Sequence, residues 1–257
     1  MPEPLLALVG VHKSFGGVRA VRDLSFHVGE GEVVGLIGPN GSGKSTTVQL
    51  VAGALTASAG DIRVDGRSVK ALPVSARVPL GLARTFQTTS LFPEYTVEEQ
   101  VLLGCHTRFR CTAAASVLQT RSSRRDDAEQ RDRAFRILEF VGLADLASVP
   151  AAAISSARQR LLMIAMALAS EPRVLLLDEP AAGMVASERK ALARVILGIR
   201  ERGVGVLVIE HHMGLILEIC QRIVVLNFGE KLAEGTPAEI RNDPRVIDAY
   251  LGNGRPC

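Results

Sequence analysis

The chain has 257 residues, 47% of them hydrophobic, which is enough for one large domain or a domain with a subdomain. Its net charge of only +3 argues against a nucleic-acid binder, and its longest apolar runs, such as Leu161 to Ala169, fall far short of the roughly 18 residues of a membrane span. Four cysteines, Cys105, Cys111, Cys220 and Cys257, have neither zinc-ligand spacing nor the density of a disulfide scaffold, which favours a reducing, cytosolic compartment.

The opening segment predicts a small antiparallel sheet. Two short strands separated by a turn at Gly16-Gly17 are expected between Leu5 and Val28. The stretch from Gly60 to Val69 repeats this pattern around an Asp-Gly pair, a typical hairpin turn. We expect these strands to lie beside a larger core.

A phosphate-binding motif follows the next strand. The apolar run from Val33 to Ile37 predicts a buried strand, and a helix is expected from Thr46 to Leu55. Between them lies a complete Walker A loop, formed by Gly38, Pro39, Asn40, Gly41, Ser42, Gly43, Lys44, Ser45 and Thr46.

The chemistry of this loop predicts a site for ATP and Mg²⁺. Its glycines let the backbone approach phosphates closely, and the start of the following helix adds about half a positive elementary charge. Lys44 is expected to reach the β- and γ-phosphates, and Ser45 to hold Mg²⁺.

The middle of the chain predicts a helical insertion. Thr96 and Glu99 form a capping-box pattern, and Phe135, Leu138 and Val141 are expected on one face of a later helix. We place the insertion at residues 91–165, between two segments, 1–90 and 166–257, that together form a nucleotide-binding core.

Two carboxylates follow the next buried strand. Leu175, Leu176 and Leu177 lead into Asp178 and Glu179, the pattern of a Walker B segment. Asp178 is expected to bind Mg²⁺ directly or through water, and Glu179 to orient and deprotonate the attacking water. In isolation, an Asp-Glu pair at a strand end is a solvated turn about as often as it is functional. In a chain that also has a Walker A loop, the functional interpretation is favoured.

The strand from Val204 to Ile209 ends in Glu210, His211 and His212. Ligands of parallel sheets gather at the carboxyl ends of strands, so we expect the His211 imidazole to reach the γ-phosphate. The remaining histidines are expected to be incidental.

Strands and helices alternate in this part of the chain, which predicts a mainly parallel sheet with covering helices. A hairpin from Ile223 to Ala233 and a capping box with a first-turn proline at Thr236 to Glu239 complete the chain. The expected fold class is therefore α/β: a P-loop NTPase core, an N-terminal antiparallel β subdomain and an inserted α-helical subdomain.

From residue 5 to 252 these motifs resemble the ATP-binding subunits of ABC transporters. Arg84 to Gln87 is similar to the Q-loop, which implies that Gln87 contacts Mg²⁺ and links the core to the helical subdomain. Ile209 to His211 is similar to the switch-histidine segment. Phe15 stands where the family places an aromatic ring that stacks on adenine, although a core position is an equal alternative.

Within the family, the chain resembles the longer of the two ATPase subunit types of branched-chain amino-acid importers. The segments that carry this resemblance are Ala83 to Gln87, Asp178 to Met184 and Asp243 to Gly252. Importers of urea or short amides share much of the pattern, so the transported solute stays open.

The signature segment departs from the family. Where the relatives have Leu-Ser-Gly-Gly-Gln, this chain has Ile154 to Arg158, with Ser155 retained, Ala157 in place of glycine and Arg158 in place of glutamine. The resemblance implies that Ser155, Ala157 and Arg158 face ATP bound on the opposite subunit. A left-handed backbone at Ala157 would cost about 1–2 kcal/mol, whereas Arg158 could replace lost donors. The D-loop differs too, with Met184 to Ala186 in place of Leu-Asn-Pro.

The resemblance implies an ATPase that drives permease subunits of an importer by ATP-dependent dimer closure. Its expected partners are a second, homologous ATPase subunit packed head to tail, the permeases and, indirectly, a solute-binding protein. It would lie at the cytoplasmic side of the inner membrane as a peripheral subunit. Whether the chain pairs with itself is open. Pairing with a different subunit would make the two ATP sites unequal, since this chain's Walker residues, Gln87 and His211 are intact while the surface it offers to its partner's ATP is altered.

Three alternative functions compete with that of a transport ATPase. An ATP-binding regulatory subunit with little turnover is compatible with the altered signature. A soluble ABC-type ATPase of translation or DNA repair usually carries two cassettes or long coiled-coil insertions, which this chain lacks. A simple P-loop kinase would leave Gln87 and His211 without a role.

Overall fold

The computed structural model describes residues 3–85, 91–105 and 121–251. The chain divides into two compact units, one formed by Met1–Arg84 with Arg173–Cys257 and the other by Thr85–Pro172. The second unit ends beyond residue 165, where we expected the insertion to end, because helix α6 (Ser156–Leu168) runs through that position.

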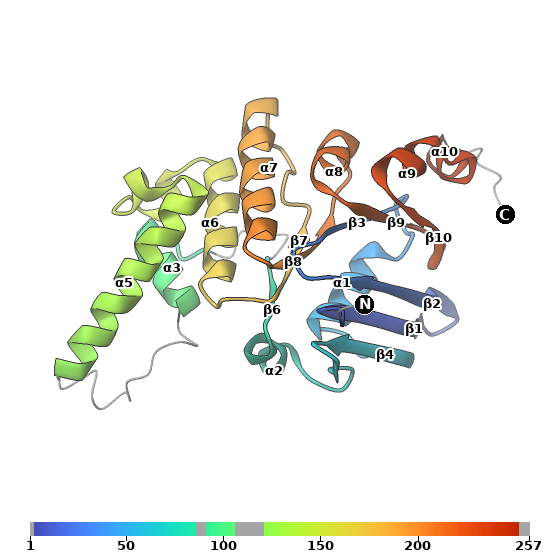
Figure 1. Ribbon diagram of the computed structural model, residues 1–257, viewed down its shortest axis with the longest axis horizontal. Coiled ribbons are helices and arrows are strands. Elements are labelled where there is room, and N and C mark those ends of the chain that lie inside the picture. The colour runs from blue at the N-terminus through green and yellow to red at the C-terminus, as the bar shows by residue number, and fades with distance from the viewer. Residues whose placement is uncertain (1–2, 86–90, 106–120, 252–257) are drawn as a thin grey trace. The chain divides into compact units, whose positions relative to one another are not determined.

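The first unit contains the two sheets that the sequence predicts (Figure 1). Its strands are β1 (Leu6–Phe15), β2 (Val18–Val28), β3 (Val33–Ile37), β4 (Ala59–Val64), β5 (Arg67–Ser68), β6 (Leu82–Arg84), β7 (Val174–Asp178), β8 (Gly205–Ile209), β9 (Arg222–Asn227) and β10 (Glu230–Gly235). Its helices are α1 (Lys44–Ala52), α2 (Val74–Arg77), the 3-10 turn η1 (Val78–Leu80), α7 (Ala186–Glu201), α8 (Met213–Ile219), α9 (Pro237–Asn242) and α10 (Pro244–Leu251).

One sheet is antiparallel and has the order β2-β1-β4-β5, which confirms the predicted N-terminal subdomain. The other has the order β10-β9-β3-β8-β7-β6 and is parallel except for the β9-β10 hairpin. Every residue of β3, β7 and β8 is buried, as expected for parallel strands covered on both faces.

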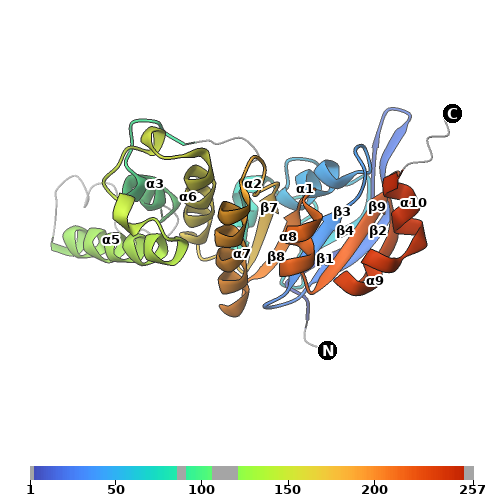
Figure 2. The ribbon, with the colours of Figure 1, turned by 90° about the horizontal axis from the view of Figure 1, so that it is seen from above.

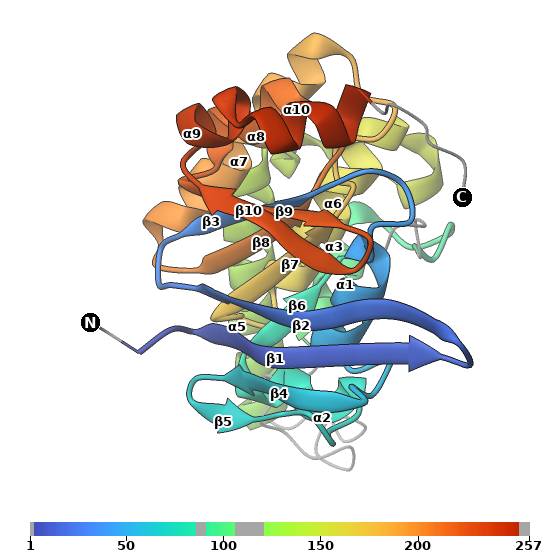
Figure 3. The ribbon, with the colours of Figure 1, turned by 90° about the vertical axis from the view of Figure 1, so that its right-hand side faces the viewer.

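Figure 3 shows what covers the parallel sheet: helices α8, α9 and α10 lie on one side, and α1 with the antiparallel sheet lies on the other. The core between the two sheets includes Leu8, Leu24, Leu36, Val48 and Leu176. Because β3, β7 and β8 run in the same direction, the segments that follow them emerge at one edge of the sheet. These segments are the Walker A loop, Glu179 and the Glu210-His211 pair.

Arg77 holds the far end of helix α1. Arg77 is 1% exposed, and its guanidinium donates to the carbonyl oxygens of Leu50 and Val51, both at 2.7 Å, and of Leu72 at 2.9 Å. Burial lowers the pKa of Arg77. The last carbonyls of a helix have no intrahelical partner, so this buried cation acts as the C-terminal cap of α1.

The second unit is helical. It contains α3 (Val97–Gly104), α5 (Arg121–Val141), η3 (Ala144–Leu146), η4 (Ala151–Ala153) and α6, and the three α-helices pack together (Figure 2). The capping box at the start of α3 is confirmed: the Glu99 N–H donates to the Thr96 hydroxyl, and the Thr96 N–H donates to the Glu99 carboxylate.

The predicted buried face of α5 is wrong at one position. Phe135 is 43% exposed, whereas Ala134, Leu138 and Val141 are buried. Residues on one face of a helix recur after three or four residues, because the helix has 3.6 residues per turn. Two successive steps of three, from 135 to 138 to 141, place positions 135 and 141 on different sides of the helix. Ala134 is the apolar residue that completes this face.

No helix within residues 3–85, 91–105 and 121–251 combines the length and apolar character needed to cross a membrane.

Candidate functional site

Within the Walker A loop, a left-handed glycine directly precedes helix α1. Gly43 has a φ of 103°, and a Cβ built on it would lie 2.6 Å from the carbonyl oxygen of Ala20. Only glycine meets both constraints. The helix therefore begins at Lys44, two residues earlier than the expected start at Thr46.

The start of α1 fits a phosphate group. It has no side-chain cap and no acidic residue in its first turn, so its first N–H groups are available to an anion. The Ser42 hydroxyl is 2% exposed and has no hydrogen-bond partner within the described chain. A buried hydroxyl in this state is costly, and a phosphate oxygen would satisfy it.

Lys44 lies along the same loop. Its side chain is largely buried, and its ammonium donates to the carbonyl oxygens of Gly38 at 2.7 Å and Pro39 at 2.9 Å. Burial lowers the pKa of Lys44, an effect that the nearby Glu179 carboxylate partly offsets. A bound triphosphate would favour the charged form of this lysine.

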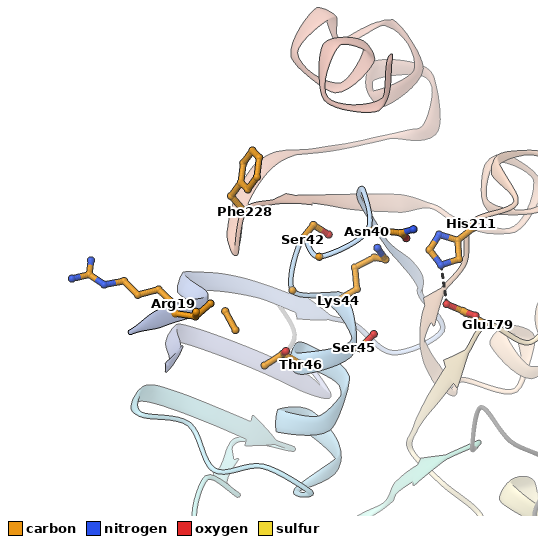
Figure 4. Close-up of a pocket in the computed structure, with 13 residues that line it drawn as sticks. Arg19, Asn40, Ser42, Lys44, Ser45, Thr46, Glu179, His211 and Phe228 are labelled. Atoms are coloured by element: carbon orange, nitrogen blue, oxygen red, sulfur yellow. Dashed lines mark hydrogen bonds and ion pairs between the residues drawn. The ribbon is translucent and has the colours of Figure 1, made fainter. Parts of the chain in front are cut away.

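A cavity of about 400 Å³ opens above the loop. It is lined by Val18, Arg19, Ala20, Asn40, Gly41, Ser42, Gly43, Lys44, Ser45, Thr46, Glu179, His211 and Phe228. Figure 4 shows Arg19 and Phe228 on one side of the loop and Glu179 and His211 on the other. The cavity therefore has two chemically different ends.

Glu179 and His211 contact each other at one of these ends. The His211 Nε2 and a Glu179 carboxylate oxygen are 2.8 Å apart, and the two side chains are 49% and 25% exposed. Glu179 has a φ of +50°, unusual for a residue other than glycine, so it points away from the direction that the strand would give it. Both residues were expected at this edge of the sheet, and the structure brings them together.

Asp178 lies in different surroundings. It is 5% exposed at the end of β7, and its carboxylate accepts a hydrogen bond of 2.9 Å from the Arg84 guanidinium on neighbouring β6. Arg84 is part of the Q-loop motif in the sequence, but the motif does not predict this ion pair. Gln87, the third residue expected at the metal, lies outside the described residues.

Sequence reasoning also missed the role of Glu210. This residue is 4% exposed and accepts hydrogen bonds from three backbone N–H groups, those of Ala181, His211 and His212. The only signal in the sequence is a carboxylate placed directly after an apolar strand. His212, expected to be incidental, caps helix α8 by accepting from the Leu215 N–H at 3.3 Å.

Phe15 is not a core residue, because it is 47% exposed. The Lys13 ammonium lies 5.1 Å from the centre of its ring. Phe228 is the aromatic residue that lines the cavity; it is 82% exposed and has a φ of +46° in the β9-β10 turn.

The altered signature segment forms an ordinary helix start. Ser155 is the N-cap of α6, and its hydroxyl accepts from the Arg158 N–H at 3.4 Å. Ala157 is buried within the right-handed helix, so the left-handed strain considered above does not arise. Arg158 is exposed. In the D-loop, Met184 is buried, and the following Val185 N–H donates to Glu188 at 2.9 Å.

Family models match two parts of the chain. The model described as ABC transporter matches residues 21–182, which is more than half of the sequence. The chain belongs to the ABC transporter family. A second model, described as branched-chain amino acid ATP-binding cassette transporter, matches residues 230–255.

Relatives within the ABC family cover almost the whole chain. It is 41% identical to the high-affinity branched-chain amino acid transport ATP-binding protein LivG of Salmonella typhimurium over 98% of this chain and 99% of the relative. It is 40% identical to the high-affinity branched-chain amino acid transport ATP-binding protein BraF of Pseudomonas aeruginosa, again over 98% of this chain and 99% of the relative. It is 36% identical to the lipopolysaccharide export system ATP-binding protein LptB of Escherichia coli over 93% of this chain and 94% of the relative.

A solved ABC cassette has the same fold. The crystal structure of the ADP conformation of MJ1267, an ATP-binding cassette of an ABC transporter, superposes with a TM-score of 0.85 at 28% identity, over 98% of this chain and 100% of that one. The predicted family and α/β fold class are confirmed, and the chain is an ATP-hydrolysing P-loop NTPase.

Proposed function

We propose that this ABC ATPase powers an importer of branched-chain or other amino acids. The observation that carries the proposal is the 40–41% identity to LivG and BraF over nearly the full length of each chain. The separate match of residues 230–255 to the branched-chain amino acid transporter model supports it. The paired Glu179 and His211 favour an ATPase that turns over rather than a regulatory ATP-binding subunit.

The proposed roles follow from the two ends of the cavity. The triphosphate binds the N–H groups at the start of α1 and the Lys44 ammonium, with its γ-phosphate towards His211. Ser45 and Asp178 would hold Mg²⁺, with Gln87 as a further contact, and the ion would supply positive charge to the triphosphate. Glu179 orients the attacking water and accepts its proton, and His211 stabilises charge on the γ-phosphate.

This orientation puts the nucleobase at the opposite end, towards Val18, Arg19 and Phe228. Phe15 remains our proposal for the ring that stacks on adenine. Its exposure leaves the ring available for such a contact.

The proposed partners are permease subunits, a second ATPase subunit packed head to tail and, through the permeases, a solute-binding protein. In such a dimer Ser155, Ala157 and Arg158 would face the ATP of the opposite subunit. The chain would be a peripheral subunit at the cytoplasmic side of the inner membrane.

Transport in proteoliposomes tests this function. We expect the complex purified with its permeases and binding protein to take up radiolabelled leucine when ATP is supplied on the side of this subunit. Glu179→Gln should abolish uptake, whereas the exposed Glu139→Gln on α5 should leave it unchanged. Uptake of urea or a short amide without uptake of leucine, isoleucine or valine would overturn the amino-acid assignment.

A further inference from the structure

Glu210 is a buried carboxylate between two functional segments. It follows strand β8 directly, and one of its oxygens accepts from the Ala181 N–H at 2.6 Å. Its other oxygen accepts from the N–H groups of His211 at 3.0 Å and His212 at 3.3 Å. The side chain therefore joins the segment that follows Walker B to the segment that carries His211.

The surroundings of Glu210 explain why a carboxylate is used. A buried charge is costly unless hydrogen bonds compensate it, and within the described residues no lysine or arginine forms an ion pair with Glu210. Among the described residues its oxygens accept from backbone N–H groups, and an ionised carboxylate is a side chain that only accepts hydrogen bonds. A glutamine of the same shape would direct an amide group at one set of these donors.

The hydrogen bonds of Glu210 belong to one network with the Glu179-His211 pair. The Glu179 N–H donates to the carbonyl oxygen of Ile209 at 2.9 Å, and the Ala182 N–H donates to that of Glu179 at 3.2 Å. The Glu179 carboxylate and the His211 Nε2, 2.8 Å apart, complete this network. Glu210 thereby adds a side-chain link, beside the backbone bond between Glu179 and Ile209, between the two segments from which Glu179 and His211 extend.

We propose that Glu210 is a positioning residue that holds the carboxylate of Glu179 and the imidazole of His211 in register for ATP hydrolysis. This inference rests on the roles proposed above for Glu179 and His211. Glu210 does not line the cavity and acts through the backbone of both segments.

The test is a double-mutant cycle on the full chain in its purified transport complex. The variants are Glu210→Gln, His211→Ala and the double variant, with Glu218→Gln on the exposed side of α8 as the matched control. The readouts are kcat for ATP hydrolysis, the Kd of a fluorescent ATP analogue and the thermal midpoint.

We expect Glu210→Gln to lower kcat by about tenfold or more while the Kd of the analogue changes by less than about twofold. In the His211→Ala background the same substitution should change kcat by less than about twofold, because its effect passes through the pair. Glu218→Gln should leave all three readouts unchanged. Should Glu210→Gln fail to fold, Glu210→Asp replaces it in the cycle, since the shorter side chain keeps the charge but not the reach.

Two results would overturn the inference. One is a further tenfold loss of kcat when Glu210→Gln is added to His211→Ala. The other is a Glu210→Gln variant that loses ATP affinity and thermal stability while its kcat is unchanged. Failure of the importer proposal looks different, because the complex would then hydrolyse ATP without moving amino acids and the cycle could still be measured. Unchanged turnover in Glu179→Gln and His211→Ala would reject the assigned site and this inference with it.

Discussion

Asp178 and Glu179 are adjacent carboxylates with different surroundings. The Asp178 side chain is 5% exposed and paired with the Arg84 guanidinium, whereas Glu179 is turned by its left-handed backbone towards His211 and the cavity. The Asp178 carboxylate is therefore held in place by a guanidinium, and the Glu179 carboxylate is placed where a water can reach it. This difference matches the proposed division between a metal ligand and a general base.

Replacing Arg84 with methionine should destabilise the fold, because it leaves the buried Asp178 carboxylate without this cation. We expect a loss of about 1–3 kcal/mol in the free energy of unfolding, measured by urea denaturation. In a chain that also carries Asp178→Asn, the loss caused by Arg84→Met should fall by at least about half. Equal losses in both backgrounds would show that the pair is not the cause.

Helix α1 has the proposed phosphate site at its start and a buried cation at its end. Its start lies under the Walker A cavity, and its end is capped by the buried Arg77. A cation at the C-terminus complements the helix dipole in the same sense as an anion at the N-terminus. Arg77 thus supports the helix that carries the phosphate site.

The substitution Arg77→Met removes this cap. It should lower the free energy of unfolding by about 2–4 kcal/mol, since the carbonyls of Leu50 and Val51 lose a charged donor. Arg67→Met, at an exposed position on β5, serves as the control and should stay within about 0.5 kcal/mol of the parent chain in the same urea experiment. Similar losses in both variants would argue against the cap.

Helix α6 begins without strain despite its altered signature. Ala157 is buried in a right-handed helix, so replacing it with glycine would relieve no backbone strain. We expect Ala157→Gly to destabilise the chain by about 0.5–1 kcal/mol, because glycine loses more backbone freedom on folding. A urea midpoint that rises in this variant would mean that alanine is strained at this position after all.

Local patterns predicted the elements of this fold well. The capping boxes at Thr96 and Thr236 and the buried strands are confirmed, because each depends on neighbours a few residues away. The ion pair of Arg84 and the bonds of Glu210 were not predicted, since both depend on which strands lie side by side. Strand order is a property of the whole sheet and cannot be derived from any one segment.

At the scale of the whole molecule, the chain combines complete Walker residues in one unit with an altered signature in the other. In the proposed dimer the signature serves the opposite ATP site. If the second ATPase subunit is a different chain, the two sites are therefore unequal. The site built on Glu179 should turn over normally, and the site that receives this chain's Ser155 and Arg158 should bind ATP but turn over slowly.

Paired substitutions in the purified complex test this asymmetry. Glu179→Gln should remove most of the steady-state ATP turnover, measured by phosphate release. The corresponding substitution in the other ATPase subunit should remove much less. Equal or greater damage from the second substitution would contradict unequal sites.

Every role proposed for this chain requires that ATP bind at the start of α1. Isothermal titration of the purified chain with ATP in magnesium buffer measures this, using Lys44→Ala and, as control, the exposed Lys190→Ala on α7. We predict one ATP per chain, an affinity weakened by about a hundredfold or more in Lys44→Ala, and an unchanged affinity in Lys190→Ala. A wild-type chain that does not bind ATP, or a Lys44→Ala variant that binds it equally well, would contradict the account.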